Sequence, residues 1–359
     1  MTPRHMVVMA AGTGGHIIPG LAVAREMQRR GWTVSWLGTR HGMENQLVPH
    51  TGIELDTIAF AGLRGRGVLQ ALTGGARLLK AFWDCLQLLR RRRPNAVLGM
   101  GGYVCFPGGM MAALLGRPLV LVNADAALLL SNRALLPVAD GIAFGFEGAD
   151  ATRTKRAVVT GNPVRAEIES LPAPAARFAG REGPLRLLVV GGSLGARALN
   201  EALAPALALI DSAHRPRITH QTGNAHHAAV SETYAAAGVE ADIVPFIDDM
   251  AARLATCDLM ICRAGAITVS ELCAAGVPSV LVPLIVSTTS HQRDNAEHLA
   301  RQGAAIHLPQ DELSPARLAE VLRGLDRAKL LAMAERARAL SRPHAAARVA
   351  DLIEGLAKP

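Results

Sequence analysis

Aromatic residues, paired cysteines and long apolar segments are all scarce in this chain of 359 residues. Phe, Trp and Tyr make up 3% of the sequence, which argues against a nucleic-acid surface built on base stacking. The five cysteines form no Cys-x-x-Cys pair and are odd in number, as is usual in a reducing compartment. The first apolar run is too short for a signal peptide, so we expect no secretory signal.

Motifs for metals and triphosphates are also missing. The sequence has no His-Glu-x-x-His, no Cys/His spacing typical of zinc, no P-loop, and no Asp-x-Asp element that could hold Mg²⁺ against a nucleotide diphosphate. We therefore expect neither a metal nor another cofactor. Helix N-termini and arginine would then have to stabilise any phosphate charge.

The remaining composition is that of a globular protein with two or three domains, since half of the residues are hydrophobic and 19% are charged. Two long uncharged stretches, residues 94–116 and 272–290, are interrupted by Gly and Pro and predict buried strands rather than membrane spans. Residues 1–164 contain 18 Lys and Arg against 9 Asp and Glu, whereas the rest of the chain is nearly neutral. We therefore expect the first half to meet an anionic partner.

Short apolar runs and helical segments alternate along the chain, which predicts an α/β fold with parallel sheets. The first helix is expected at residues 19–30, opened by Pro19 and ended by Gly31. At the other end of the chain, an amphipathic helix follows a bend at Pro343 and could cross back to the first domain.

Three glycine-rich turns, at residues 11–16, 99–103 and 191–197, carry most of the functional information. The first and third each join a strand-like run to a helix, where backbone N–H groups and the helix dipole favour a phosphate. Because each half of the chain contains such a turn, the sequence predicts two nucleotide-binding folds that face each other across a cleft.

Four polar residues lie in or near segments of this kind. His16 could take a proton from an attacking hydroxyl, or could only cap a turn. Glu271 could accept hydrogen bonds from both ribose hydroxyls, or be a favourable charge near a helix start. Ser193 could bind a phosphate or act as an N-cap, and Arg165 could neutralise a diphosphate or remain solvated.

Eight short segments combine into one pattern. They are Gly12-Thr13-Gly14-Gly15-His16, Leu63-Arg64-Gly65, Gly99-Met100-Gly101-Gly102-Tyr103, Gly161-Asn162-Pro163-Val164-Arg165, Gly191-Gly192-Ser193, Phe246-Ile247-Asp248-Asp249-Met250, Cys262-Arg263-Ala264-Gly265-Ala266 with Thr268 and Glu271, and His291-Gln292 with Asn295. In this order they closely resemble the MurG family of N-acetylglucosaminyltransferases. The resemblance extends from about residue 5 to the C-terminus.

The resemblance implies a GT-B glycosyltransferase fold, in which two Rossmann-like domains with parallel sheets face a cleft. Residues 1–164 with the returning helix 343–359 would form the acceptor and membrane-facing domain, and residues 165–342 the donor domain. The implied reaction is an inverting, metal-independent transfer of GlcNAc from UDP-GlcNAc to the C4 hydroxyl of the muramoyl sugar on undecaprenyl diphosphate. The protein would act peripherally at the cytoplasmic face of the bacterial inner membrane, in peptidoglycan synthesis.

The resemblance also implies roles for individual residues. His16 would be the catalytic base. The implied donor contacts are Ile247 at uracil, Glu271 at ribose, Ser193 at the diphosphate with Arg165 close by, and Ala266, Ile267 and Gln292 at GlcNAc. The acceptor diphosphate would be bound by Thr13, Gly14, Gly15, Gly101, Gly102 and Tyr103.

The chain departs from the family pattern after residues 119–121, where Val122-Asn123-Ala124-Asp125 replaces His-Glu-Gln-Asn. The family asparagine is credited with a contact to a sugar hydroxyl of the donor, and Asp125 could accept but not donate such a hydrogen bond. Because the His and Glu of the pattern are lost, more of the acid–base chemistry would fall on His16.

The segment from Gly67 to Arg93 is both apolar and basic, and it ends in four consecutive arginines. It could bind an anionic membrane surface, where each Lys or Arg contributes about 1 kcal/mol, or be a helix with a solvated basic end.

Two other functions stay open at this point. One is a different nucleotide-sugar enzyme of the same fold, such as a glycosyltransferase with a soluble acceptor or a UDP-GlcNAc epimerase. The other is a non-catalytic UDP-sugar or lipid-binding protein. The basic, apolar segment and Gly102-Tyr103 argue against the first, and the departure at Asp125 makes the second conceivable.

Overall fold

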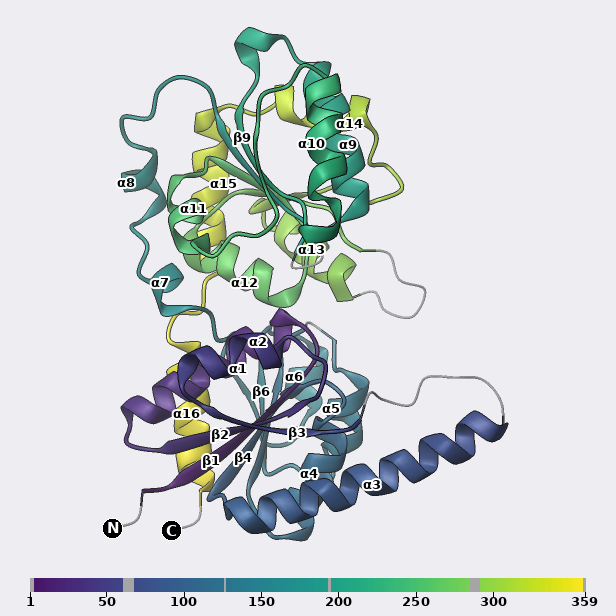
Figure 1. Ribbon diagram of the computed structural model, residues 1–359. Helices are drawn as coiled ribbons and strands as arrows, with labels where there is room; N and C mark the ends of the chain where they lie inside the picture. The colour runs from purple at the N-terminus through teal and green to yellow at the C-terminus, as the bar shows by residue number, and fades with distance from the viewer. Residues whose placement is uncertain (1–2, 61–67, 126, 193–194, 285–290, 358–359) are drawn as a thin grey trace. The chain divides into compact units, whose positions relative to one another are not determined.

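The computed structural model describes residues 3–60, 68–125, 127–192, 195–284 and 291–357 (Figure 1). The chain divides into two compact units: unit 1 comprises residues 1–165 and 344–359, and unit 2 comprises residues 166–343. Each unit contains a parallel sheet with helices packed on it. The predicted α/β fold with two Rossmann-like, parallel-sheet domains is confirmed.

Unit 1 is built on a sheet with the strand order β3-β2-β1-β4-β5-β6-β7. Its strands are β1 (His5–Ala10), β2 (Thr33–Thr39), β3 (Glu54–Ile58), β4 (Ala96–Gly101), β5 (Leu119–Asn123), β6 (Gly141–Phe144) and β7 (Ala157–Val159). Its helices are α1 (Gly14–Arg29), α2 (Glu44–Leu47), η1 (Pro49–Thr51), α3 (Val68–Arg92), α4 (Cys105–Leu114), α5 (Leu130–Leu135), α6 (Ala149–Arg153) and α16 (Ala345–Leu356).

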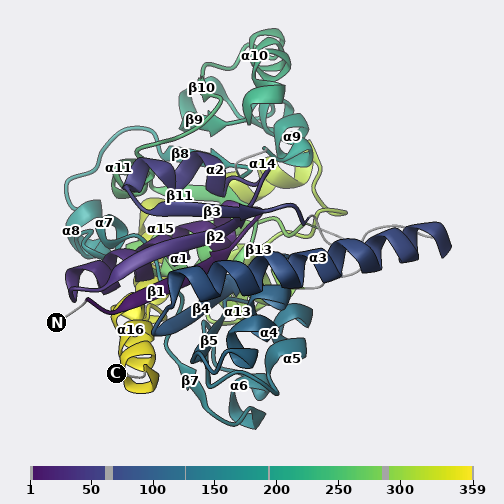
Figure 2. The same cartoon turned by 60° about the horizontal axis from the view of Figure 1, so that its bottom comes forward.

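Both faces of this sheet are covered. Val7 and Met9 of β1 pack in a core shared with α3, α4 and α5, whereas Met6 and Val8 pack with α1 and α16. Figure 2 shows α3 alongside α4 on the first of these faces. Burial on both sides explains why the central strands are continuous apolar runs in the sequence.

The first helix begins earlier than predicted. It starts at Gly14 rather than at Pro19, and the N–H groups of His16 and Ile17 already donate to the Thr13 carbonyl oxygen. Pro19 is inside the helix, where it cannot donate to the Gly15 carbonyl. The helix continues because residues on both sides of Pro19, among them Ile17 and Val23, are buried in the core. As a result, His16 belongs to the first turn of α1.

The C-terminal helix α16 packs on unit 1. Arg30, which follows α1, makes ion pairs with Asp351 (2.7 Å) and Glu354 (2.6 Å), and Trp32 Nε1 donates to Glu354 (3.1 Å). On the inner side, Val349 and Ile353 are completely buried. The last helix is therefore an integral layer of unit 1.

Unit 2 has a smaller sheet with the strand order β10-β9-β8-β11-β12-β13. Its strands are β8 (Arg186–Val190), β9 (Arg217–Gln221), β10 (Asp242–Val244), β11 (Leu259–Cys262), β12 (Ser279–Leu281) and β13 (Ala305–His307). Its helices are α7 (Ala166–Glu169), α8 (Pro174–Phe178), α9 (Arg197–Ala208), η2 (Ser212–His214), η3 (Asn224–His226), α10 (His227–Ala236), α11 (Met250–Thr256), α12 (Ala266–Ala275), α13 (His291–Arg301), α14 (Pro315–Arg323) and α15 (Arg327–Ala339).

The core of unit 2 contains a buried polar pair. His220 of β9 and Tyr234 of α10 lie with the His220 Nδ1 and Tyr234 Oη atoms 3.0 Å apart, and their rings meet edge to face. Burial lowers the pKa of His220 to about 4 and raises the pKa of Tyr234. The folded unit therefore requires a neutral imidazole.

This pair predicts that unit 2 loses stability in mild acid. Below the unfolded pKa of about 6.5, unfolded chains bind a proton that the folded state does not, so stability falls by about 2 kcal/mol from pH 7 to pH 5. Urea unfolding followed by circular dichroism at the two pH values measures this loss. In His220→Gln, which cannot titrate but can still hydrogen-bond Tyr234, the loss should be much smaller.

Fluorescence supplies an internal control, since Trp32, Trp36 and Trp83 all belong to unit 1. The tryptophan transition should respond equally to pH in the parent and in His220→Gln. If the variant kept the whole pH dependence of unit 2, the buried imidazole would not be its cause.

Candidate functional site

Each unit has a point at which the strand order reverses. In unit 1 this point lies between β1 and β4, and in unit 2 between β8 and β11. Ligands of open α/β sheets bind beyond the carboxyl ends of the strands at such points. The loops that follow these four strands contain the three glycine turns and the segment before α12. Each unit thus offers a candidate half-site of its own.

In unit 1, the loops after β1 and β4 touch each other. The Ala11 N–H donates to the Gly101 carbonyl oxygen (3.3 Å), and a Cβ on Gly102 would lie 2.4 Å from the Ala11 carbonyl oxygen. A Cβ on Gly101 would lie 2.4 Å from Nδ1 of His16. Both glycines also have positive φ angles, +124° and +89°. Only glycine satisfies both demands.

His16 lies against this pair of loops. Its Nδ1 atom is buried, and the described residues provide no hydrogen-bond partner for it. Burial lowers the pKa of His16 below its ordinary value, while the Asp125 carboxylate and the Met100 backbone oppose that shift. The imidazole is therefore neutral near pH 7, which is the form that can accept a proton.

Asp125 lies in unit 1, in a loop held by buried asparagines. Asn123 Nδ2 donates to the Asp125 carbonyl oxygen (2.8 Å), and Asn123 Oδ1 accepts from the Leu129 N–H (3.0 Å) and from Asn132 (3.1 Å). Asn162 Nδ2 donates to the carbonyl oxygen of Ala124 (2.9 Å). Asn123, at the Glu position of the family pattern, therefore supports the loop that brings the Asp125 charge to His16.

The remaining predicted acceptor residues surround the start of α1 and the loop after β4. Thr13 has an extended backbone and Gly14 and Gly15 open the helix, where N–H groups have no intrahelical acceptor. Tyr103 is exposed. The turn at Gly12 also contacts Glu44, a buried carboxylate that the sequence analysis missed.

In unit 2, the predicted donor residues lie on three elements. Ala266 and Ile267 are the first residues of α12, Glu271 is in its second turn and is only 8% exposed, and Ile247 is buried in the loop after β10. Gln292 belongs to α13, and its Oε1 accepts from the Leu284 N–H (2.9 Å). Ser193 lies outside the described residues.

The loop before α12 is fixed by two side chains. Asn295 Nδ2 donates to the Ala264 carbonyl oxygen (3.1 Å), and Arg263 donates to the Val282 carbonyl oxygen (3.1 Å). The first contact joins the loop after β11 to α13, and the second joins it to the residue that follows β12. The backbone N–H groups at the start of α12 therefore have a fixed direction, as an anion or sugar site requires.

Two residues that were predicted to contact the donor belong to unit 1: Asp125 and Arg165, the last residue of that unit. Among the described residues, no cluster of three or more His, Cys, Asp or Glu side chains has the arrangement of a metal site. Within the same residues, no helix combines the length and apolar character needed to cross a bilayer.

Comparisons with known proteins agree along the whole chain. Residues 6–144 match the glycosyltransferase family 28 N-terminal domain, and residues 186–354 match the glycosyltransferase family 28 C-terminal domain. A protein of Methylibium petroleiphilum named UDP-N-acetylglucosamine–N-acetylmuramyl-(pentapeptide) pyrophosphoryl-undecaprenol N-acetylglucosamine transferase is 72% identical, with 100% of this chain and 99% of the relative covered. The protein of the same name from Chromobacterium violaceum is 64% identical, with 99% of both covered.

A solved structure gives the same result. The crystal structure of MurG from Acinetobacter baumannii has a TM-score of 0.82 and 39% sequence identity, and covers 98% of this chain and 100% of its own.

The geometry around His16 predicts an effect of the Asp125 charge. Because the carboxylate raises the pKa of His16 against the effect of burial, Asp125→Asn should lower that pKa further. Ring-labelled histidine in NMR titrations measures it, with His16→Ala to assign the signal. An unchanged or higher pKa in Asp125→Asn would show that the carboxylate does not act on the imidazole. His220 provides a control signal whose pKa should stay the same.

Proposed function

The chain belongs to glycosyltransferase family 28, and from this premise we propose that unit 2 binds UDP-GlcNAc while unit 1 presents a lipid-linked acceptor. The protein transfers N-acetylglucosamine from UDP-GlcNAc to the muramoyl-pentapeptide on undecaprenyl diphosphate, a step of peptidoglycan synthesis. The single observation that carries this conclusion is the 72% identity to a transferase of that name over the full chain.

We propose the following contacts between residues of unit 2 and the donor UDP-GlcNAc. Glu271 would accept hydrogen bonds from the ribose hydroxyls, and the backbone at Ile247 would recognise uracil. Ala266, Ile267 and Gln292 would face GlcNAc, and Ser193 would face the diphosphate. The fixed N-terminus of α12 supports this assignment, because its N–H groups and helix dipole favour the negatively charged diphosphate and the sugar oxygens next to it.

For the acceptor, we propose that His16 is the general base. The imidazole would take the proton of the C4 hydroxyl while that oxygen bonds to the anomeric carbon of GlcNAc. The bond from the anomeric carbon to the diphosphate breaks, and UDP leaves with the electron pair. Attack from the face opposite UDP inverts the anomeric centre. The lowered pKa of His16 supports the role, since the base must be neutral at the start.

Binding of the two diphosphates would depend on backbone and arginine rather than on a metal. The N–H groups of Thr13, Gly14 and Gly15, together with Gly101, Gly102 and Tyr103, would bind the acceptor diphosphate. Arg165 would add positive charge to the donor diphosphate. Donors fixed in direction before the reaction stabilise leaving-group charge without reorganisation. Asp125 could accept a hydrogen bond from a sugar hydroxyl.

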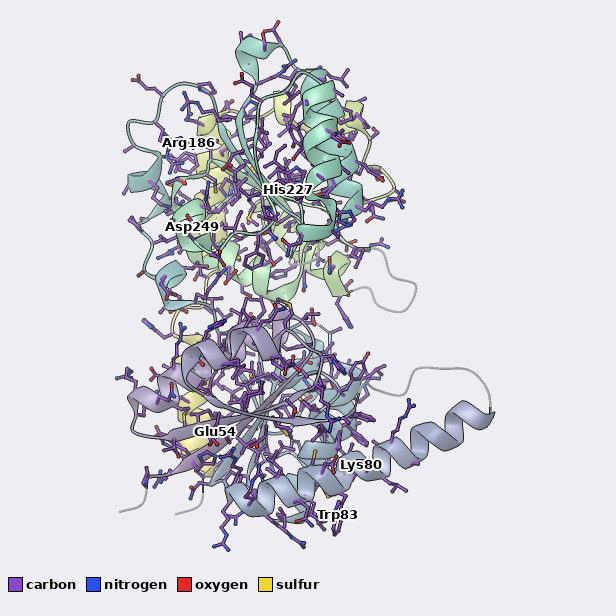
Figure 3. All side chains as sticks on the ribbon, viewed as in Figure 1. Glu54, Lys80, Trp83, Arg186, His227 and Asp249 are labelled. Atoms are coloured by element: carbon purple, nitrogen blue, oxygen red, sulfur yellow. The ribbon has the colours of Figure 1, made fainter. Side chains whose placement is uncertain are left out.

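We also propose that unit 1 binds the anionic cytoplasmic surface of the inner membrane through residues 67–93. On α3, Leu79 is 71% exposed and Trp83 58% exposed, beside the basic Arg77 and Lys80, and Figure 3 shows Lys80 and Trp83 on this helix. The two following helices of unit 1 also carry exposed leucines, with Leu114 of α4 at 68% and Leu130 of α5 at 81%.

Part of the basic charge on α3 is used within unit 1. Arg91 pairs with Asp56 (2.6 Å), and Arg92 pairs with both Asp56 and Glu54 of β3. The arginines at the end of α3 are therefore partly structural. Membrane affinity should consequently depend on exposed apolar residues as much as on charge.

This surface predicts a measurable change in vesicle binding. Replacing both Leu79 and Trp83 by Ser should reduce flotation with anionic vesicles at least tenfold, because two exposed apolar anchors are lost. The control is Leu209→Ser, which replaces a leucine of unit 2 that is 51% exposed, and this variant should float like the parent. High salt should weaken parent binding, and equal flotation of the double variant and the parent would contradict the proposed surface.

The reaction itself predicts the behaviour of His16→Ala. Loss of a general base should lower kcat about 10²- to 10⁴-fold with little change in the KM for UDP-GlcNAc. The measurement uses radiolabelled UDP-GlcNAc and a synthetic lipid-linked muramoyl acceptor, with labelled disaccharide as the product. Near-normal turnover of the variant would remove His16 from the role of base.

Glu271→Ala is the reciprocal control in the same assay. It should weaken donor binding by about 1.5–3 kcal/mol, since a charged hydrogen-bond partner of the ribose is lost. If the parent hydrolysed or epimerised UDP-GlcNAc without forming disaccharide, the proposed acceptor would be wrong.

A further inference from the structure

Glu44 is a completely buried carboxylate that the proposed mechanism does not use. It is the first residue of α2, shortly after the carboxyl end of β2. Its Oε1 atom accepts hydrogen bonds from the N–H (2.7 Å) and the hydroxyl (2.6 Å) of Thr39. Its Oε2 atom accepts from the N–H of Gly12 (3.0 Å). Each carboxylate oxygen is thus engaged by neutral donors.

A backbone hydrogen bond also joins Gly12 to the loop that precedes Glu44. The Met43 N–H donates to the Gly12 carbonyl oxygen (3.2 Å), so adjacent residues hold both polar groups of Gly12. The turn between β1 and α1 is therefore fastened at two points to the loop after β2. The N–H belongs to the peptide unit before Gly12 and the carbonyl oxygen to the unit after it, so the two bonds hold both peptide units that flank Gly12.

The loop after β2 is built around this carboxylate. A Cβ on Gly38 would lie 2.6 Å from the Glu44 side chain, and a Cβ on Gly42 would lie 1.9 Å from Glu44 Oε2. Asn45 Nδ2 closes the loop by donating to the carbonyl oxygens of Thr39 (2.9 Å) and Gly42 (3.0 Å). Two glycines and one amide thus make a fitted space for Glu44.

Dinucleotide-binding folds place an acidic residue in this part of the chain for a different purpose. There the carboxylate after β2 faces the ribose of the ligand, and the glycine turn faces its phosphates. In unit 1 the acid after β2 turns inward and accepts from the glycine turn itself. The N–H of Gly12 already has an internal anion, which leaves the N–H groups of Thr13, Gly14 and Gly15 for a ligand.

The turn held by Glu44 is followed directly by the first turn of α1, which contains His16. The residue before Gly12 is Ala11, whose N–H donates to Gly101 and whose carbonyl oxygen is packed against Gly102. Three residues after Thr13, His16 packs against Gly101. A shift of the turn would therefore move the base and the three N–H groups proposed to bind the acceptor together.

We propose that Glu44 is a positioning residue of the acceptor half-site: it holds the first glycine turn from behind, as an internal ligand of Gly12, in the conformation that receives the acceptor diphosphate. The inference rests on the proposed function of unit 1. It assigns Glu44 no contact with either substrate and no proton transfer.

The test is Glu44→Gln, which keeps size but puts an amide in place of an acceptor pair. One amide N–H₂ group would then face Gly12 or Thr39, both of which donate. The acceptor kcat/KM should fall about 10- to 100-fold, as expected for the loss of a charge-assisted hydrogen bond. The KM for UDP-GlcNAc should stay within about twofold of the parent, because unit 2 is unchanged. A residue that only stabilised the fold would lower the active fraction and leave both KM values intact.

Glu354→Gln is the matched control, since Glu354 is also a carboxylate of unit 1 that accepts from two side chains, Arg30 and Trp32. It should keep the parent KM values. If Glu44→Gln does not fold, Thr39→Val removes only the hydroxyl donor to Glu44 and should raise the acceptor KM by a few-fold with a normal tryptophan spectrum. Parent-like acceptor kinetics in the folded Glu44 or Thr39 variant would overturn the inference. A parent enzyme that forms no disaccharide would instead contradict the proposed function.

Discussion

The close approach of two backbone turns at the β1–β4 boundary is the constraint on which the proposed chemistry of unit 1 depends. The proposed ligand carries a diphosphate, and the residues proposed to bind it are Thr13, Tyr103 and four glycines, none of which has a positive charge, so their backbone N–H groups would have to bind it. Such groups reach a ligand only where no side chain covers them, and at Gly101 and Gly102 even a Cβ would overlap His16 or Ala11. The Gly101 N–H itself donates to the Sγ atom of Cys105 (3.2 Å), so Gly101 contributes the close approach of the two loops rather than a donor to the ligand.

The layers of the fold could be predicted because they are encoded locally. Strands such as β5 and β8 are short, continuous apolar runs bounded by polar or glycine residues, which is the pattern of a parallel strand buried on both faces. The sequence analysis did not identify β3, β7 or β13, all of which are edge strands of their sheets and are less buried than the central strands. The predicted start of the first helix at Pro19 was wrong for another reason. Burial of the residues around Pro19 outweighs the loss of one backbone hydrogen bond, and this tertiary burial cannot be read from a local sequence pattern.

The candidate site divides in the same way. His16 and the glycine turns could be found because a turn and the helix that follows it are adjacent in the sequence. Glu44 could not, because its contact with Gly12 is set by strand order: β2 is next to β1, and this pairing brings Glu44 to the turn after β1. The role of Asn123 could not be found either, although its partners Asp125, Leu129 and Asn132 are close in the sequence, because the loop that brings them together has no repeating sequence pattern. A signal did exist in each case, since each is a polar residue at or shortly after the end of a buried strand. That signal indicates an edge of the sheet but not whether the side chain faces a ligand or the protein.

The charge of Asp125 connects the departure from the family pattern to the chemistry of the base. A buried imidazole loses basicity, and a base that is too weak accepts a proton poorly however well it is positioned. An asparagine at this position would leave burial largely unopposed, whereas the Asp125 carboxylate restores part of the basicity of His16. The hydrogen bonds from Asn123 and Asn162 fix the peptide groups on either side of Asp125, so the carboxylate is held where it opposes the effect of burial on the imidazole.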